Sequence, residues 1–341
     1  MLPWLRNKPC KDVIMKKKTH LIKEKFRKNW IDGLRAFAII LVVLGHQLKG
    51  VTWYFIFTSP IKMPLFFAIS GYLFSTKNFD DRAFFKNWFI KLILPWFGLA
   101  FIPMLPNLLS GRVGVCELMM NLISGKMLWF MPCFVVAEVI HYYIRKFSKT
   151  ESSVIVLSLI ITMFGFWANH IGILNFAMIN RAFIVQSFFL MGYIFKSHEN
   201  LLTNISWKMI LCSSLLYVIL CGLGIFLFGF VAINVHSNNY FNIPYCFVLI
   251  SLGLYTLFTA ASKSQYSNKA LSIIGKNTLL LYIWHKQVIT IFVFLLSHLS
   301  LTITNIYISA IFKTLWAIVI CNVLARYINL YIPELVGKKR D

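Results

Sequence analysis

The feature that most constrains this chain is a series of ten long apolar stretches separated by short gaps. About 20 apolar residues suffice to cross a bilayer as a helix. The stretches lie at about 31–48, 57–75, 88–108, 127–145, 153–173, 177–195, 208–231, 243–262, 274–296 and 304–328. We therefore expect an all-α polytopic membrane protein with about ten transmembrane helices.

The composition supports this fold class. Charged residues make up 13% of the chain and hydrophobic residues 59%, whereas a soluble domain has about 25% charged residues. So little polar surface cannot cover a soluble protein of this size, and so apolar a chain is not disordered. The net charge of +23 is spread over the gaps rather than over one face, so no nucleic-acid partner is expected.

The basic residues predict the topology. If the N-terminus is cytoplasmic, the inner gaps and both tails hold 25 Lys and Arg, and the outer gaps hold four: Lys49, Lys62, Arg112 and Lys126. This bias follows the positive-inside rule and predicts a multi-pass protein of the cell inner membrane, surrounded by lipids, with both termini cytoplasmic. We divide the chain into a basic tail (1–29), a membrane domain (30–332) and a second basic tail (333–341).

Cysteine and histidine give no metal signature. The seven Cys form no CxxC motif and no Cys/His pair with zinc spacing, and most lie within apolar stretches. We expect no metal site and no structural disulfide.

A few ionisable residues remain within or near the apolar stretches, where such groups are costly and often functional. They are Asp32, Arg35, Glu138, Arg181, Lys286, Lys313 and Arg326, together with some histidines. Three of the ionisable groups share the first stretch. Arg35 and His46 are eleven residues apart, about three turns plus 20°, so they lie on one helix face about 16 Å apart along the axis. Asp32 lies within about 40° of His46 in projection.

This stripe has two interpretations. It can be an ion pair at a helix mouth with a His packed in the core. Alternatively, Arg35 can bind the phosphates of an anionic donor, with Asp32 as its partner, while His46 takes a proton from an attacking hydroxyl.

Motifs along the chain resemble, in order, those of the membrane acyltransferase type 3 family. Arg35-x10-His46 after Asp32-Gly33-Leu34 resembles the signature of the family's first helix. The further matches are PLFFAISGYLF (64–74), Lys91-Leu-Ile-Leu-Pro95 with Lys in place of Arg, LWFMPCFVVAEV (128–139) and IGKNTLLLYIWH (274–285). The sequence FMPC and the short chain resemble the branch of sugar O-acetyltransferases such as fucose 4-O-acetylase.

The resemblance implies an O-acyltransferase whose donor is acetyl-CoA, a substrate rather than a resident cofactor. The acceptor would be a hydroxyl of a cell-envelope carbohydrate or of its lipid-linked precursor. Arg35, Lys86 and Lys91 would hold the CoA end. Lys lacks the bidentate fork that Arg offers a phosphate. His46 would act as general base or would carry the acyl group transiently.

Other residues are candidates for substrate binding. Trp129 can stack on a sugar or belong to an interfacial aromatic belt. His285 is either functional or a packing residue, and Glu138 can pair with Arg181 or Lys286 or orient a His. The uncharged gap 232–242 can hydrogen-bond a sugar, although a solvated loop is the simpler interpretation.

Two other functions fit the same composition. A transporter or flippase of lipid-linked sugars also has many spans with buried charge, although the sequence has no inverted repeat. A non-catalytic subunit that binds sugar or polyprenyl chains is the second alternative. The sequence names neither the acceptor nor the acyl group.

Overall fold

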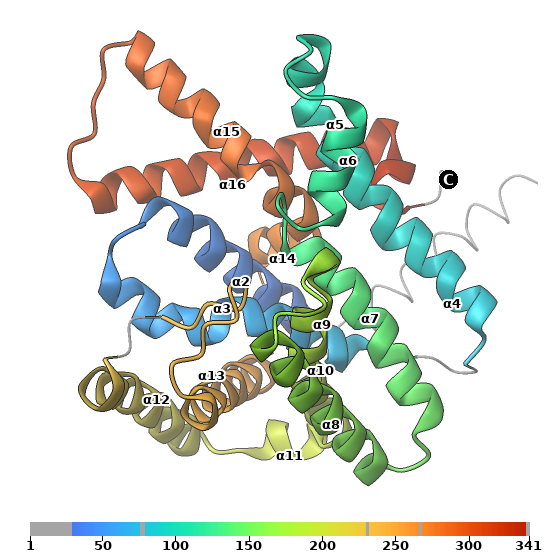
Figure 1. Cartoon of the computed structure of the whole chain (residues 1–341). Coiled ribbons are helices and arrows are strands. Elements are labelled where there is room, and N and C mark those ends of the chain that lie inside the picture. Colours follow the sequence, from blue (N-terminus) through green and yellow to red (C-terminus); the bar gives the residue numbers. More distant parts are fainter. Residues whose placement is uncertain (1–28, 76–78, 230–231, 266–267, 339–341) are drawn as a thin grey trace, which may run out of the picture.

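The computed structural model describes residues 29–75, 79–229, 232–265 and 268–338. Most of the predicted N-terminal tail, and the end of the C-terminal tail, lie outside these ranges. The described chain is helical, with an isolated β-bridge between Asn234 and Asn239 (Figure 1). The α-helices are α2 (Asn29–Gln47), α3 (Thr52–Leu73), α4 (Asp81–Trp88), α5 (Leu94–Leu109), α6 (Val115–Ile123), α7 (Phe130–Phe147), α8 (Glu151–His170), α9 (Ile179–Ile184), α10 (Gln186–Ser197), α11 (Glu199–Asn204), α12 (Trp207–Phe228), α13 (Ile243–Ser264), α14 (Lys269–Lys276), α15 (Thr278–His298) and α16 (Ile306–Tyr331).

The helices confirm the predicted fold class. Within the described ranges, eight helices are long and apolar enough to cross a membrane, and the pair around α9 and α10, bent by 45°, would make a ninth. Each of the ten predicted stretches contains a helix. The fourth is α7, which has 18 residues but carries Glu138, Arg145 and Lys146. The ten-span topology and the side of the termini therefore stay predictions.

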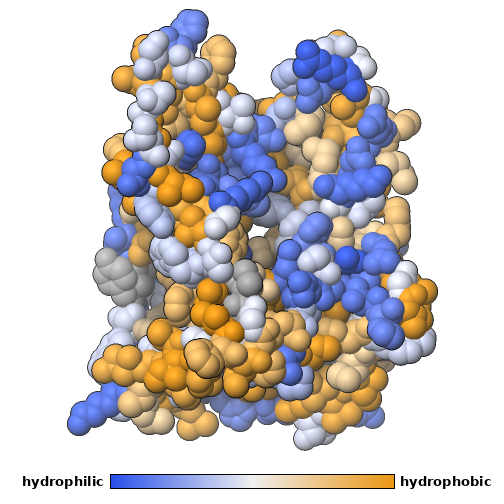
Figure 2. Space-filling model, turned by 60° about the vertical axis from the view of Figure 1, so that its left-hand side comes forward, coloured by the Kyte–Doolittle hydropathy of each residue, from blue (hydrophilic) through white to orange (hydrophobic). Residues whose placement is uncertain are grey.

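The outer surface of the bundle suits a lipid environment. In each of the helices α8, α12, α15 and α16, only 22–33% of the residues in the apolar membrane-spanning segment are buried inside the protein. In α12, for example, Phe226 is 94% exposed. Figure 2 shows hydrophobic residues along the flanks of the molecule. A helix surface of this kind is stable where lipid rather than water covers it.

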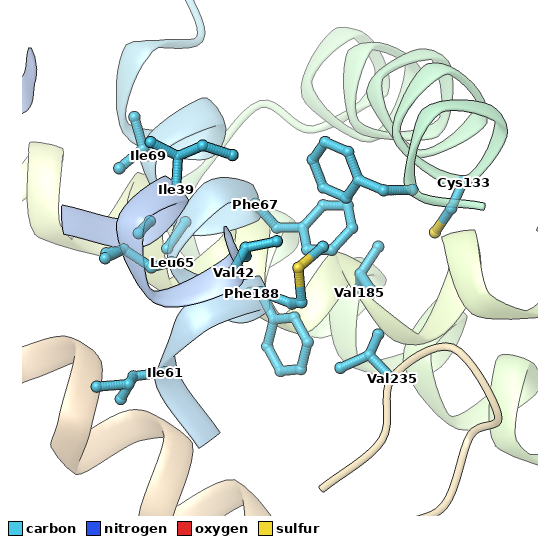
Figure 3. Packing of buried hydrophobic residues seen from close by; sticks show 14 of the residues in the cluster. Ile39, Val42, Ile61, Leu65, Phe67, Ile69, Cys133, Val185, Phe188 and Val235 are labelled. Carbon is cyan, nitrogen blue, oxygen red and sulfur yellow. The ribbon is translucent and has the colours of Figure 1, made fainter. Parts of the chain in front are cut away.

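The core forms where α2 and α3 pack against α7 and α10. Figure 3 shows Ile39 and Val42 of α2 beside Phe67 of α3 and Phe188 of α10. Helices α3 and α10 approach closely because glycines face each other's backbone. A Cβ on Gly71 would lie 2.0 Å from the carbonyl oxygen of Phe189. Close approach of helices at small residues is a common pattern in membrane proteins.

Proline changes the third apolar stretch more than the second. Pro60 and Pro64 lie within a continuous α3. Pro95 stands in the first turn of α5, directly after a π-helical segment, Phe89–Ile93. Because Pro lacks the N–H that would bond to the fourth residue before it, the wider π turn fits this position. The segment carries Lys91.

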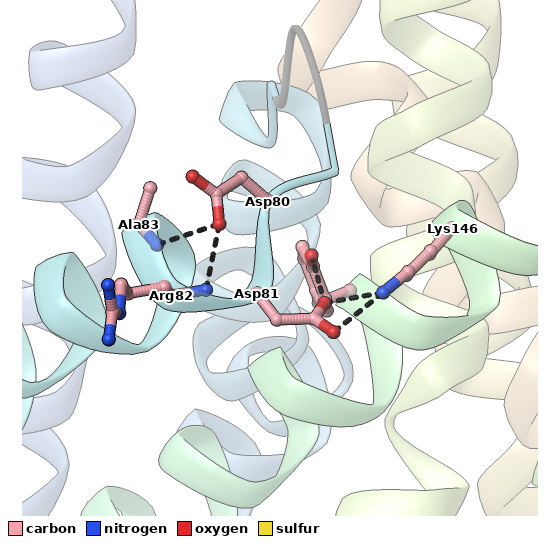
Figure 4. A network of polar contacts seen from close by, with 6 residues as sticks. Asp80, Asp81, Arg82, Ala83 and Lys146 are labelled. Carbon is pink, nitrogen blue, oxygen red and sulfur yellow. Dashed lines mark hydrogen bonds and ion pairs between the residues drawn. The ribbon is translucent and has the colours of Figure 1, made fainter.

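Helix α4 is fixed at its N-terminus. Asp80 caps the helix by accepting hydrogen bonds from the backbone N–H groups of Arg82 and Ala83, at 2.9 and 3.3 Å (Figure 4). The neighbouring Asp81 forms an ion pair of 2.6 Å with Lys146 of α7. These contacts hold α4 against α7 outside the central bundle.

Candidate active site

A cavity of about 560 Å³ opens where several helices end. Its walls come from the C-terminal end of α2, the first half of α3, the middle of α5, the turn before α7, residues 232–236 and α15. Figure 2 shows a face that is hollowed, with hydrophilic residues gathered around the hollow. A cavity of this size, with apolar walls and a few polar groups, is typical of a small-molecule site.

Two histidines stack in the wall of this cavity. His46, one residue before the end of α2, lies with its ring centroid 5.0 Å from that of His285 in α15, and the ring planes differ by 28°. His46 is half-buried and His285 is 2% exposed. The sequence separates these residues by more than 200 positions, and the fold places them side by side.

The backbone around His285 fixes the position of its proton. Its Nδ1 lies 3.0 Å from the carbonyl oxygen of Leu281 and 2.9 Å from that of Tyr282. A carbonyl oxygen only accepts, so Nδ1 is the donor and Nε2 keeps its lone pair in the neutral ring. Among the described residues, this buried Nε2 has no hydrogen-bond partner. His285 therefore keeps a lone pair on this buried nitrogen next to the His46 ring.

Trp129 also lines the cavity. Its two predicted roles, substrate binding and an interfacial belt, stay predictions. The turn before Trp129 passes through Leu128, whose φ of +53° is rare for a non-glycine residue. The indole lies 5.3 Å from the ring of His236, at an angle of 45°. Together these rings form an aromatic wall. Within the part of the chain that the structure describes, no Asp or Glu lines the cavity.

The segment 232–236 forms part of the cavity wall. The backbone N–H of Ile233 donates to Ser59 of α3 at 2.9 Å, and the Nε of Arg181 donates to the carbonyl oxygen of His236 at 3.0 Å. Partial burial lowers the pKa of His236, and the Arg181 guanidinium lowers it further. Ile233 and Val235 are buried in this wall, whereas Asn234 and His236 stay exposed. The choice between a sugar-binding loop and a solvated loop stays a prediction.

Asp32 and Arg35 lie at the opposite end of α2 and do not line the cavity. An Nη1 of Arg35 lies 3.9 Å from Oδ1 of Asp32, and the Ser272 hydroxyl donates to Asp32 at 3.4 Å. Asp32 is 1% exposed, whereas the side chain of Arg35 is 30% exposed. Helix α14 packs here so closely that a Cβ on Gly275 would lie 2.0 Å from the Asp32 carbonyl oxygen.

Three further predicted site residues lie elsewhere. Lys86 of α4 and Lys91 of the π-helical segment are exposed, and neither lines the cavity. Glu138 of α7 is also outside the cavity wall. It forms no ion pair with Arg181 or Lys286, and its buried Oε2 has no hydrogen-bond partner among the described residues. Lys91 acts on the Glu138 carboxyl electrostatically. Their predicted roles stay predictions.

Four lysines line the cavity that sequence reasoning did not place in the site: Lys49, Lys62, Lys126 and Lys286. They come from four separate segments, so no local motif signals them. Lys286 is marked in the sequence as an ionisable residue within an apolar stretch, whereas Lys49, Lys62 and Lys126 are marked only by their position outside the basic inner gaps.

A comparison with known families gives the class of the protein. A family model described as "Acyltransferase domain", of the acyltransferase 3 type, matches residues 28–326, most of the chain. The chain therefore belongs to the membrane acyltransferase 3 family and is a multi-pass membrane acyltransferase. No match was found among curated proteins or among solved structures.

Proposed function

We propose that this protein is an O-acyltransferase of the cell inner membrane that transfers an acetyl group from acetyl-CoA to a hydroxyl of a cell-envelope carbohydrate. The acceptor would be a surface polysaccharide or its lipid-linked precursor. One observation carries the proposal: the stacked His46–His285 pair lies in a cavity whose wall includes Trp129. A base that can take the hydroxyl proton, beside an aromatic surface on which a sugar ring can stack, suits transfer to a sugar hydroxyl.

The reaction needs a proton acceptor at the hydroxyl. As the hydroxyl oxygen attacks the acetyl carbonyl carbon, His46 removes its proton, the new C–O bond forms and the C–S bond to CoA breaks. The proton then passes to the departing thiolate, so the products are the acetyl ester and free CoA. The neighbouring His285 presents its free Nε2 as the second basic nitrogen of the site.

The donor would enter from the other end of α2. Arg35 lies on the same face of the helix as His46, about 16 Å away along the axis. A half-exposed guanidinium suits a phosphate of CoA, and Asp32 positions it through their ion pair. Exposed Lys86 and Lys91 add positive charge at the approach. The long pantetheine arm would span the distance to His46.

The proposal is tested in a deletion strain complemented with variants. Mass spectrometry of the envelope polysaccharide should show one acetyl group per repeat with the wild-type chain and with Arg112→Gln, which removes an exposed charge outside the cavity. The His46→Ala variant should insert normally and leave the polymer unacetylated.

Two results would contradict the proposal. Full acetylation by the His46→Ala variant would remove this residue from the mechanism. Loss of the whole polymer from the surface in the deletion strain would indicate a flippase instead.

A further inference from the structure

The positive charge of the cavity is not explained by acetyl transfer alone. Four ammonium groups surround it, on Lys49 after α2, Lys62 of α3, Lys126 before α7 and Lys286 of α15. None of them forms an ion pair with a carboxylate among the described residues. Three act electrostatically on the His46 ring, and Lys49 acts on Lys286. A cluster of like charges without a counter-ion is unfavourable unless a ligand supplies the negative charge.

The distribution of charge along the chain makes this cluster more unusual. The predicted topology assigns four basic residues to the outer side, and three of them line this one cavity: Lys49 and Lys126 in gaps and Lys62 within α3; the fourth is Arg112. The same gaps contain a single carboxylate, that of Glu117, which does not line the cavity. The positive-inside rule disfavours outer Lys and Arg, so their concentration at the stacked histidines needs a separate cause.

We propose that the acceptor is anionic and carries a carboxylate or phosphate close to the hydroxyl that is acylated. This inference rests on the proposed function and names the substrate class of the same site. The four lysines hold the acidic group while the hydroxyl faces His46. Lysine recognises charge without imposing the planar geometry that arginine does, so an acidic sugar and a sugar phosphate both fit. The phosphates of CoA belong at the Arg35 end of α2.

The test measures binding to the purified full-length chain in lipid nanodiscs. Three probes share one hexose skeleton and differ in charge: glucose, glucuronic acid and glucose 6-phosphate. Saturation-transfer NMR at low salt should give at least one acidic probe an affinity about tenfold higher than that of glucose, or about 1.4 kcal/mol, because hydrogen bonds to charged groups are the stronger ones. Added salt should reduce the difference. The acidic probe that binds identifies the group as carboxylate or phosphate.

Variants locate the effect. The double variant Lys49→Gln/Lys286→Gln changes two exposed side chains and should abolish the preference for acidic probes, whereas the matched control Arg112→Gln should keep it. A separate Lys62→Met variant tests the half-buried lysine. Binding of CoA should be unchanged in the double variant.

The outcomes are separable. Equal binding of all three probes, or a preference that survives in the double variant, would overturn the inference. So would a loss of CoA binding in the double variant, since the lysines would then serve the donor. Binding does not require catalysis, so the His46→Ala variant should retain the preference. Failure of the proposed function would instead show as acetyl transfer by that variant.

Discussion

The two ends of α2 differ in how the fold treats them. At the C-terminal end, His46 is half-buried in a cavity wall with a second ring and four ammonium groups nearby. At the N-terminal end, Asp32 is sealed by α14 and pairs with Arg35. The C-terminal end of α2 can therefore hold a ligand in the cavity. The N-terminal end is fixed by packing and offers one partly exposed cation, Arg35. We propose that the acceptor binds at the C-terminal end of α2 and the phosphates of the donor at its N-terminal end.

The largest effect on folding stability is expected where α14 seals the Asp32 end. A Gly275→Val substitution would place a Cβ 2.0 Å from the Asp32 carbonyl oxygen, so the helices must separate. We expect a loss of about 3 kcal/mol or more in stability, visible as a large fall in the temperature of unfolding in detergent. Gly222→Ala in α12 is the control, since no atom lies within 4 Å of its added Cβ. Equal stability of the two variants would show that this end is not tightly packed.

A smaller effect should separate donor from acceptor. Arg35→Gln should raise the KM for acetyl-CoA about ten- to a hundredfold through loss of a charge-assisted hydrogen bond. The KM for glycan isolated from the deletion strain should stay within about twofold. Arg35→Lys should lie between, since it keeps the charge and loses the fork. A change confined to the acceptor KM would place the donor elsewhere.

The reverse pattern is expected at Trp129. Trp129→Ala should raise the KM for the same glycan about two- to tenfold, as expected for loss of an aromatic contact, and should leave the KM for acetyl-CoA unchanged. Trp129→Phe should retain most of the affinity. If both Trp129 variants behave like wild type, the indole serves only as part of an interfacial belt.

The smallest effect is expected at the exposed lysines of α4 and the π-helical segment. Lys86→Gln and Lys91→Gln should each raise the KM for acetyl-CoA by less than about threefold, because exposed charges are screened by solvent and salt. The difference should vanish at high ionic strength. A tenfold effect that persists in salt would indicate direct phosphate contact.

The sequence predicts what is local and misses what depends on packing. Asp32, Arg35 and His46 share one helix, so helical spacing alone relates them. The stacking of His46 on His285, by contrast, requires α2 and α15 to meet, and only the family resemblance gave His285 weight. The four cavity lysines come from separate segments; Lys286 stands out as a charge within an apolar stretch, but nothing in the sequence relates it to Lys49, Lys62 and Lys126. The break between α9 and α10 is likewise a tertiary feature.

The segment 232–236 shows the same limit. It belongs to the gap 232–242, whose polar and uncharged composition equally suits a solvated loop, although Ala232, Ile233 and Val235 are apolar. Its place in the cavity wall depends on contacts with Ser59 and Arg181, which lie 174 and 55 residues away. No pattern within the segment encodes such partners.

The central claim is that acyl transfer takes place at the stacked histidines. The most direct measurement is the initial rate of transfer from radiolabelled acetyl-CoA to glycan isolated from the deletion strain, for His46→Ala, His285→Ala and the double variant. His170→Ala, exposed at the end of α8, is the control. We predict that His46→Ala loses about 10²–10⁴-fold in rate and that the double variant loses little more, because the pair acts as a unit. A His46→Ala variant with the wild-type rate would contradict the account.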